Sequence, residues 1–333
     1  MNRTIAAQPS PTVTASDTTR APSHAVPARP DPNFALDARL GRMKLALRDG
    51  TYRRYRSAQE VEVLTECDRE NLSWPRRAAR LTRRMCEAQR VVILPEEQIV
   101  FTRTTRTIPR VYSQADWQTV TAGRSLHENG PISNICADWR LLLSQGLLGR
   151  RQVALATRDR LYEEHESVEF LDCVMETIDA VLGLAVRYAD EATRLNRPEL
   201  AEILRRVPAH PARTFREALQ SIRLCHSVLW LSGHYHCGLA RFDQYMWPFL
   251  QEDLASGRLT TEIAEQLLAE FFLLLNRDSD LYPGIQQGDN GQSLMLGGVK
   301  RDGSDAVNPL THVVLRVARG VGLIDPKINL RVN

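Results

Sequence analysis

The sequence predicts an α/β fold that is predominantly helical. From Phe34 onward, long stretches repeat apolar residues at helical spacing, and the last fifty residues change to a strand–helix–strand pattern. That final pattern predicts a crossover unit in a largely parallel sheet. The 333 residues include 43% hydrophobic residues, which is enough for a packed core in one large domain or two ordinary ones.

The N-terminal 33 residues differ from the rest of the chain. They are rich in Pro, Ser, Thr and Ala and contain almost no large apolar side chains. Such a segment cannot offset the entropy lost on ordering, so we predict a disordered tail over residues 1–33. The folded part is expected to span residues 34–333.

Helices are expected wherever apolar residues recur every three or four positions. Gly50 is a plausible stop for the first helix and Gly257 for a later one, while Thr260 or Thr261 can cap the helix that follows. That last helix is apolar all round, which predicts burial on every side. The expected helices cover residues 34–50, 57–71, 74–89, 163–196, 212–231, 243–256, 261–275 and 312–323.

Strands are expected in three places. Residues 91–102 read as a short β pair because β-branched residues flank Pro95, and residues 292–299 and 327–333 read as single strands. The chain stops inside or just after the last of these. An edge strand at a bare terminus is a poor end for a sheet, so we expect the sequence to be truncated, with partner strands encoded downstream.

Charge and cysteine usage exclude several classes of protein. The net charge of +3 arises from 43 basic and 40 acidic residues, which gives no electrostatic case for nucleic acid. Six cysteines without a Cys-x-x-Cys pair indicate neither a disulfide framework nor a zinc ribbon. No apolar run reaches a membrane span and no secretory signal is evident, so we expect a protein of the reducing cytoplasm.

A short polar segment between two apolar ones is the first candidate site. It contains His234 and His236, which flank a tyrosine. One interpretation is a metal site for a hydrolase, in which His226 or Asp243 completes the ligand set of the His-x-His pair. The other is that at least one of His234 and His236 contacts a substrate near neutral pH. Cys237 is expected to be a buried small side chain.

Four motifs in order resemble the glycyl radical enzymes of the pyruvate formate-lyase superfamily, and the similarity covers roughly residues 34–333. The motifs are Thr214-Phe215-x-Glu217-Ala218-Leu219-Gln220, Arg241-x-Asp243-Gln244-Tyr245, Asp253-Leu254 with Gly257, and Gly297-Gly298 with Asp302-Gly303 and Asn308-x-Leu310-Thr311. In this interpretation Arg241 and Asp243 form a structural ion pair or cap.

The resemblance implies the N-terminal part of a ten-stranded α/β barrel, incomplete at its C-terminus. Such enzymes carry a thiyl cysteine in a Gly-Cys-x-Glu context and a radical glycine in an Arg-Val-x-Gly-Tyr motif, and neither motif occurs in this sequence. The resemblance therefore implies that the catalytic residues are encoded elsewhere and that this part is inactive alone. It would supply no cofactor itself, while the full-length enzyme would hold a glycyl radical.

The resemblance also implies an activity and partners. The full-length enzyme would be an anaerobic lyase or acyltransferase of the formate acetyltransferase, decarboxylase or dehydratase type. It would cleave a C–C or C–X bond in a small organic acid or related molecule. Its partners would be that small-molecule substrate, a second identical subunit and a radical S-adenosylmethionine activating enzyme, with no nucleic acid or membrane involved.

Two further segments could line the substrate pocket. Asn134 occupies the place of a pocket histidine in the dehydrating members of the family. Because an amide does not ionise, this difference argues against diol-dehydratase activity. Alternatively, Asn134 caps a helix that begins near Ala137. The amide-rich loop containing Gln287 and Asn290 resembles one in aryl-acid decarboxylating members, or it merely satisfies its own backbone. The proposed substrate-binding residues are thus His234, His236, Asn134, Gln287 and Asn290.

Two other functions remain open. The chain could be a helical scaffold, a degenerate paralogue that kept the fold and lost the chemistry. It could also be a metal-dependent hydrolase built on His234 and His236, which would predict stoichiometric zinc or iron in the purified protein.

Overall fold

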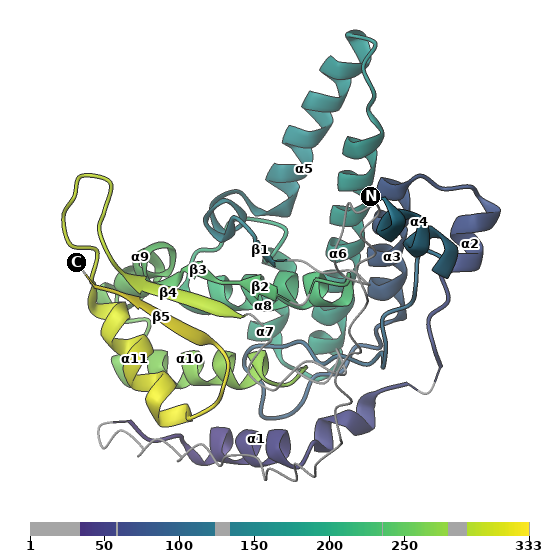
Figure 1. Ribbon diagram of the computed structural model, residues 1–333. Helices are drawn as coiled ribbons and strands as arrows, with labels where there is room; N and C mark the ends of the chain where they lie inside the picture. Colours follow the sequence, from purple (N-terminus) through teal and green to yellow (C-terminus); the bar gives the residue numbers. More distant parts are fainter. Residues whose placement is uncertain (1–33, 58, 124–133, 235, 279–291, 333) are drawn as a thin grey trace, which may run out of the picture.

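A computed structural model describes residues 34–57, 59–123, 134–234, 236–278 and 292–332 (Figure 1). The predicted α/β, predominantly helical fold is confirmed in these residues. The elements in chain order are α1 (Ala38–Arg48), the 3₁₀ helix η1 (Thr51–Tyr55), α2 (Leu64–Arg69), α3 (Trp74–Ala88), α4 (Gln114–Ala122), β1 (Asn134–Cys136), α5 (Trp139–Glu163), α6 (Glu169–Arg194), α7 (Pro198–Arg206), α8 (Phe215–Leu231), β2 (His236–Gly238), β3 (Ala240–Arg241), α9 (Phe242–Ala255), α10 (Thr261–Leu275), β4 (Ser293–Gly297), α11 (Pro309–Val321) and β5 (Lys327–Arg331). The predicted tail over residues 1–33 lies outside the described residues.

Every strand pairing in these elements is parallel. β1 pairs with β2, and β4 lies between β3 and β5. The Leu239 amide donates a 2.7 Å hydrogen bond to the Ser293 carbonyl, which links the two ladders where the chain passes from β2 to β3. The predicted crossover is confirmed, because α11 connects the parallel neighbours β4 and β5.

The core is built around α8 and α10. Nearly every residue of α8 is buried, and its sides contribute to two apolar clusters, one shared with α9, α10 and α11 and the other with α3, α6 and α7. Residues 267–275 of α10 are all buried, as the apolar run predicts. Leu294 and Leu296 of β4 join the first cluster, so α9, α10 and α11 pack against the sheet (Figure 1).

The long helix predicted over residues 163–196 is wrong at its start. Glu163 ends α5, and α6 begins only at Glu169. The polar residues between them turn the chain back on itself, with His165 in the left-handed conformation at φ 59°. As a result α5 and α6 pack side by side and project from the rest of the molecule (Figure 1). None of the described helices is both long and apolar enough to cross a bilayer.

A glycine permits the sharp bend within α5. Gly146 has φ 67° and ψ 170°, which interrupts the helix. A Cβ atom here would lie 2.4 Å from the Ala209 carbonyl oxygen, so only glycine fits. The next two amides, of Leu147 and Leu148, bond to the carbonyls of Pro208 and Ala209, and α5 is thereby tied to the segment before α8.

The β pair predicted over residues 91–102 is also wrong, since this segment forms no ladder in the structure. Buried side chains bond to its main chain instead. Gln220 accepts from the Val100 amide at 2.7 Å and donates to the Val100 carbonyl at 2.9 Å. Glu270 accepts from the amides of Gln98 and Ile99 at 2.6 and 2.8 Å. These side chains satisfy the main-chain groups that a neighbouring strand would otherwise have to satisfy.

Candidate active site

The parallel sheet brings together two segments that are far apart in the sequence. In the β1–β2 ladder Asn134 is the partner of His236, and Ile135 is the partner of Cys237. Both Asn134 and His236 are the first residues of their strands. Two of the residues expected to bind substrate therefore lie opposite each other at the amino ends of neighbouring strands.

Buried side chains hold the turn that carries the candidate histidines. Trp139, the first residue of α5, donates from Nε1 to the Gly238 carbonyl at 2.9 Å, and His226 of α8 lies 3.2 Å from the Cys237 carbonyl through Nε2. Because a carbonyl only accepts, His226 carries its proton on Nε2. The Cys237 thiol donates to the His234 carbonyl at 2.9 Å. The carbonyls of Cys237 and Gly238 are thus held by side chains from two helices.

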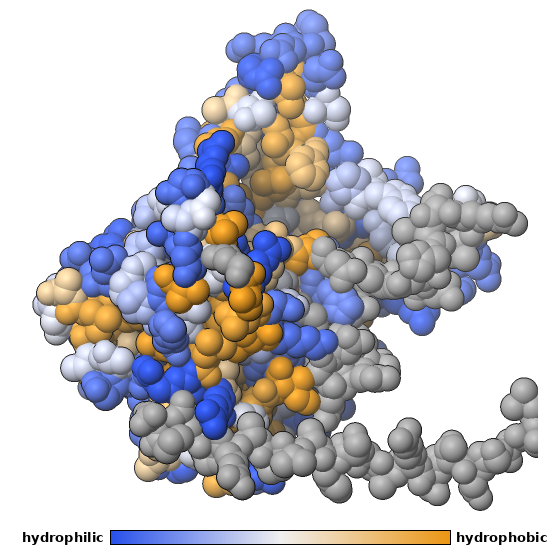
Figure 2. Space-filling view, turned by 60° about the vertical axis from the view of Figure 1, so that its left-hand side comes forward, coloured by the Kyte–Doolittle hydropathy of each residue, from blue (hydrophilic) through white to orange (hydrophobic). Residues whose placement is uncertain are grey.

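His234 borders an apolar cavity of about 450 Å³ that lies between α3, α5, α6 and α8. This volume is within the roughly 300–1,000 Å³ typical of small-molecule sites. Polar groups in the wall are few, and among them the hydroxyls of Thr82 and Ser232 lie 2.9 Å apart. The lining residues Leu142, Phe170 and Val174 belong to the projecting α5–α6 pair, whose apolar flank is visible in Figure 2.

Partial burial changes the ionisation of His234. Desolvation lowers the pKa of its imidazole below the ordinary value, so the neutral form predominates at neutral pH. A neutral imidazole has one donor and one acceptor nitrogen. His234 can therefore both donate to and accept from a polar group of a molecule in the cavity.

The described residues do not supply a metal site around the His-x-His pair. No group of three or more His, Cys, Asp or Glu side chains in the described part of the chain is arranged to hold a metal ion. The proposed third ligands are engaged elsewhere. His226 bonds to the Cys237 carbonyl, and Asp243 accepts from the Gly297 amide at 2.8 Å and from the Thr311 hydroxyl at 2.6 Å.

Arg241 and Asp243 are structural, but among the described contacts they form neither the expected ion pair nor a side-chain cap of α9. Arg241 donates to the carbonyls of Val299 and Gly297 at 3.0 and 2.8 Å, whereas Asp243 accepts from the Gly297 amide. The two side chains therefore hold the end of β4 through its main chain.

The structure tests one expectation for the other two candidate segments. Asn134 does not cap the following helix, because Asp138 is the N-cap of α5 and accepts from the Leu141 amide at 2.9 Å. Asn134 belongs to β1 instead. Gln287 and Asn290 lie outside the described residues.

Two cysteines near the site, Cys225 and Cys237, have buried thiols that do not ionise at neutral pH. Cys237 and Cys225 are buried or half-buried, and burial raises the pKa of each thiol to about 12. Both thiols therefore remain protonated at neutral pH. This agrees with the expectation that Cys237 is a buried small side chain.

A buried network of charged side chains lies behind the site and was not predicted from the sequence. Asp278 accepts from Arg103 Nε and Arg223 Nη2, each at 3.1 Å. Burial alone would raise the pKa of Asp278, but the surrounding arginines hold it below its ordinary value. Arg277 pairs with Glu97, which is fully buried. The signal available in the sequence was Arg223, a charged residue within the apolar pattern of α8.

Comparison with known sequences identifies the class of protein. The profile of the Pyruvate formate lyase-like family matches residues 110–333, more than half of the chain. The chain belongs to this family and thus to the glycyl radical enzyme superfamily, as the motifs predicted.

Individual relatives agree with this assignment. The chain is 29% identical over 221 residues to isethionate sulfite-lyase of Nitratidesulfovibrio vulgaris, a match that covers 59% of this chain and 27% of the relative. It is 26% identical over 192 residues to the glycyl radical subunit of 4-hydroxyphenylacetate decarboxylase from Clostridioides difficile, covering 52% and 20%. The chain thus spans about a quarter or less of the length of these relatives.

A solved structure supports the fold over a longer range. A protein from Roseburia inulinivorans, studied for 1,2-propanediol dehydration, superposes with a TM-score of 0.71 at 23% identity. The superposition covers 92% of this chain and 48% of the solved chain. At this identity the similarity concerns the fold alone.

Proposed function

We propose that this chain forms the N-terminal part of a glycyl radical enzyme barrel and one wall of its substrate pocket. In this proposal the complete enzyme cleaves a C–C or C–X bond in a small organic acid or a related oxygenated molecule. The observation that carries the proposal is the β1–β2 register, which sets Asn134 opposite His236, two residues after the cavity-lining His234. Relatives that are a sulfite-lyase and a decarboxylase support this range of chemistry.

The role of this chain in the reaction is to bind and orient. The glycyl radical of the complete enzyme would supply hydrogen-atom abstraction, and neither a Gly-Cys-x-Glu nor an Arg-Val-x-Gly-Tyr motif occurs in these 333 residues. His234, His236 and Asn134 would hold polar groups of the substrate, since orientation decides which hydrogen is abstracted. Gln287 and Asn290 precede β4 in the sequence and would contribute neutral donors.

In this proposal the chain depends on the rest of the enzyme and on partners for activity. The 333 residues would show no turnover by themselves. The complete enzyme would act as a homodimer and would depend on a radical S-adenosylmethionine enzyme for activation. The competing function is a non-catalytic scaffold that kept the fold.

The reading frame after the codon for Asn333 tests enzyme against scaffold. The proposal expects an open frame that encodes Gly-Cys-x-Glu and then Arg-Val-x-Gly-Tyr. An in-frame stop codon at that position would contradict it and favour the scaffold. Sequencing of the transcript decides between the two.

Hydrogen exchange of the backbone amides tests the substrate contact. We expect saturating 4-hydroxyphenylacetate or isethionate to slow exchange in residues 134–136 and 236–239. His234→Gln and His236→Gln should each weaken that protection at least fivefold, because each removes a ring that holds the substrate. His312→Gln is the matched control, since His312 is exposed on α11, away from this cavity. Protection confined to other segments, or equal effects of all three variants, would contradict the assignment.

A further inference from the structure

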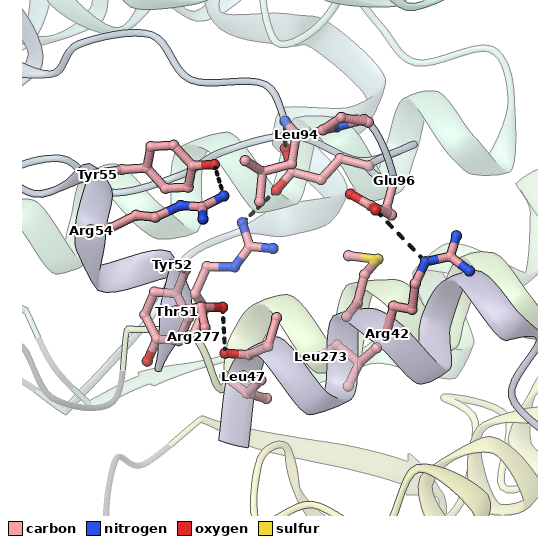
Figure 3. A pocket seen from close by; sticks show the side chains of 14 residues that line it. Arg42, Leu47, Thr51, Tyr52, Arg54, Tyr55, Leu94, Glu96, Leu273 and Arg277 are labelled. Atoms are coloured by element: carbon pink, nitrogen blue, oxygen red, sulfur yellow. Dashed lines mark hydrogen bonds and ion pairs between the residues drawn. The ribbon is translucent and has the colours of Figure 1, made fainter. Parts of the chain in front are cut away.

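A second pocket lies on the other side of α10 from the sheet and shares no lining residue with the His234 cavity. It has a volume of about 220 Å³ and is enclosed by α1, η1, residues 94–97 and the C-terminal end of α10 (Figure 3). The proposed function assigns no role to it. Its lining combines apolar side chains, two tyrosines and three arginines, and this combination indicates a ligand class.

The backbone turn between α1 and η1 leaves space for this pocket. α1 ends at Arg48, and Gly50 adopts the left-handed conformation with φ 63°, so the chain turns into η1 and does not continue along α1. The Tyr55 carbonyl then accepts from Arg90 at 2.6 Å, and the Ser57 amide donates to the Thr104 carbonyl at 2.7 Å. η1 is thereby held away from α1 and forms one wall.

Arg277 offers unused donors to this pocket. Its Nη1 donates both to Glu97 and to Thr102, the latter at 2.9 Å, while Nε and Nη2 make no hydrogen bond with any described residue. The guanidinium extends into the middle of the pocket between Tyr55 and Glu96, as Figure 3 shows. Only 8% of the side chain is exposed, so these donors are close to fully desolvated. Desolvated guanidinium donors favour an anionic acceptor.

The remaining charges leave the pocket cationic. Glu97 is fully buried, and its two oxygens are occupied by Arg277, Thr102 and the Leu94 amide. Glu96 lies 3.8 Å from Arg42 at the rim. No carboxylate of a described residue pairs with Arg54, whose Nη2 donates to the Tyr55 hydroxyl at 2.7 Å. The lining therefore holds three guanidinium groups against two carboxylates.

The apolar part of the lining excludes a bare inorganic anion as the best ligand. Met43, Leu47, Leu94 and Leu273 form an apolar surface next to the cationic groups. The ring of Tyr52 is buried, with the Arg277 guanidinium 6.0 Å from its centroid. A ligand that fills this space needs an apolar body as well as a negative charge, because exposed apolar lining gains from burial.

We propose that this pocket binds a small carboxylate that carries an aromatic or branched apolar body. The carboxylate bonds to Arg277 and Arg54, and the body packs on Met43, Leu47 and Leu273. This binding site is separate from the pocket proposed for substrate.

Calorimetric titration of the 333-residue chain with benzoate at low salt tests the proposal. We expect one benzoate per chain, with binding at least tenfold weaker for neutral benzamide and for inorganic phosphate. Benzamide lacks the charge and phosphate lacks the apolar body. Equal affinity for benzoate and either comparator, or no benzoate binding, would overturn the proposal.

Variants assign the binding to this pocket. Arg54→Ala should weaken benzoate binding about fivefold, the expected effect of one partly exposed charge-assisted contact. Arg53→Ala is the matched control, because Arg53 is exposed on the same turn and does not line the pocket. Ala46→Phe should fill the pocket and abolish binding, and Arg54→Ala decides the matter if Ala46→Phe does not fold. His234→Gln should leave benzoate binding unchanged. If His234→Gln abolished binding and Arg54→Ala had no effect, the site would be the other cavity and the proposal would be wrong.

Discussion

The segment of residues 91–105 and the β4–α11–β5 crossover both pack against α10, but they are held in different ways. The crossover is regular, with parallel strands and a helix that starts in a capping box at Asn308 and Thr311. The segment has no regular structure, and its main chain bonds to Gln220 and Glu270. The charged residues at its ends, such as Arg103, reach into the buried network around Asp278.

This difference indicates which side chains contribute most to the free energy of unfolding. In the crossover each main-chain hydrogen bond is one of many in a ladder or helix, so no single side chain is critical. In the segment a few buried polar side chains hold the whole stretch, and the loss of one leaves several buried groups without a partner. We therefore expect single substitutions to have much larger effects on the segment than on the crossover.

The largest effect is expected from Asp278→Asn. The substitution leaves Arg103 and Arg223 buried without their shared counter-charge, which should lower the free energy of unfolding by about 3–5 kcal/mol. Chemical denaturation measures the change. Asp179→Asn removes the surface partner of Arg151 and should change stability by less than about 1 kcal/mol. Equal effects of the two substitutions would show that the buried network does not anchor the segment.

The neutral side chain of His226, which bonds to the Cys237 carbonyl, should make the free energy of unfolding depend on pH. Burial lowers the pKa of His226 to about 4, whereas an unfolded histidine titrates near its ordinary value of about 6.5. The unfolded chain therefore binds the proton first. The contribution of neutral His226 is fully present above about pH 6.5 and is lost as the pH falls to 4, a loss of about 3 kcal/mol.

The matched variant for this prediction is His226→Gln, which can still donate to the Cys237 carbonyl but does not titrate. Denaturation curves between pH 7 and pH 4 should fall less steeply for the variant than for the parent chain. Parallel pH profiles would mean that folding does not lower the pKa of His226.

A somewhat smaller loss is expected from Gln220→Leu. This change removes both hydrogen bonds to Val100, whose amide and carbonyl are buried, and should destabilise the protein by about 2–3 kcal/mol. Hydrogen exchange should show faster exchange at the Val100 amide. If that amide stayed protected, another acceptor would hold the segment.

The smallest effect is expected in the crossover. Asn308→Ala removes the N-cap of α11 and should lower the free energy of unfolding by about 1 kcal/mol. A loss as large as that of Asp278→Asn would contradict the contrast between the two regions.

The sequence predicted the parts of the fold that repeat a period. The crossover, the stop of α9 at Gly257 and the buried run of α10 all follow from local patterns. Residues 91–102 could not be predicted, because β-branched residues indicate a strand without showing whether a neighbouring strand exists. The turn near His165 was missed because the polar residues around it do not exclude a helix.

The candidate site was predictable only in part. The polar turn with His234 and His236 stands out locally, and family similarity selected Asn134. The alignment of Asn134 with His236 depends on strand register, which no local pattern specifies. The pairing of Asp278 with Arg103 joins residues far apart in the chain, so it became visible only in three dimensions.

The central claim is that this chain forms one part of a glycyl radical enzyme. The most direct test is the electron paramagnetic resonance spectrum of the polypeptide encoded by the complete reading frame, recorded after anaerobic activation by a radical S-adenosylmethionine enzyme. We predict a glycyl radical signal that is absent from the 333-residue chain treated in the same way. The absence of that signal from the complete polypeptide, under conditions that activate an isethionate sulfite-lyase, would contradict the account.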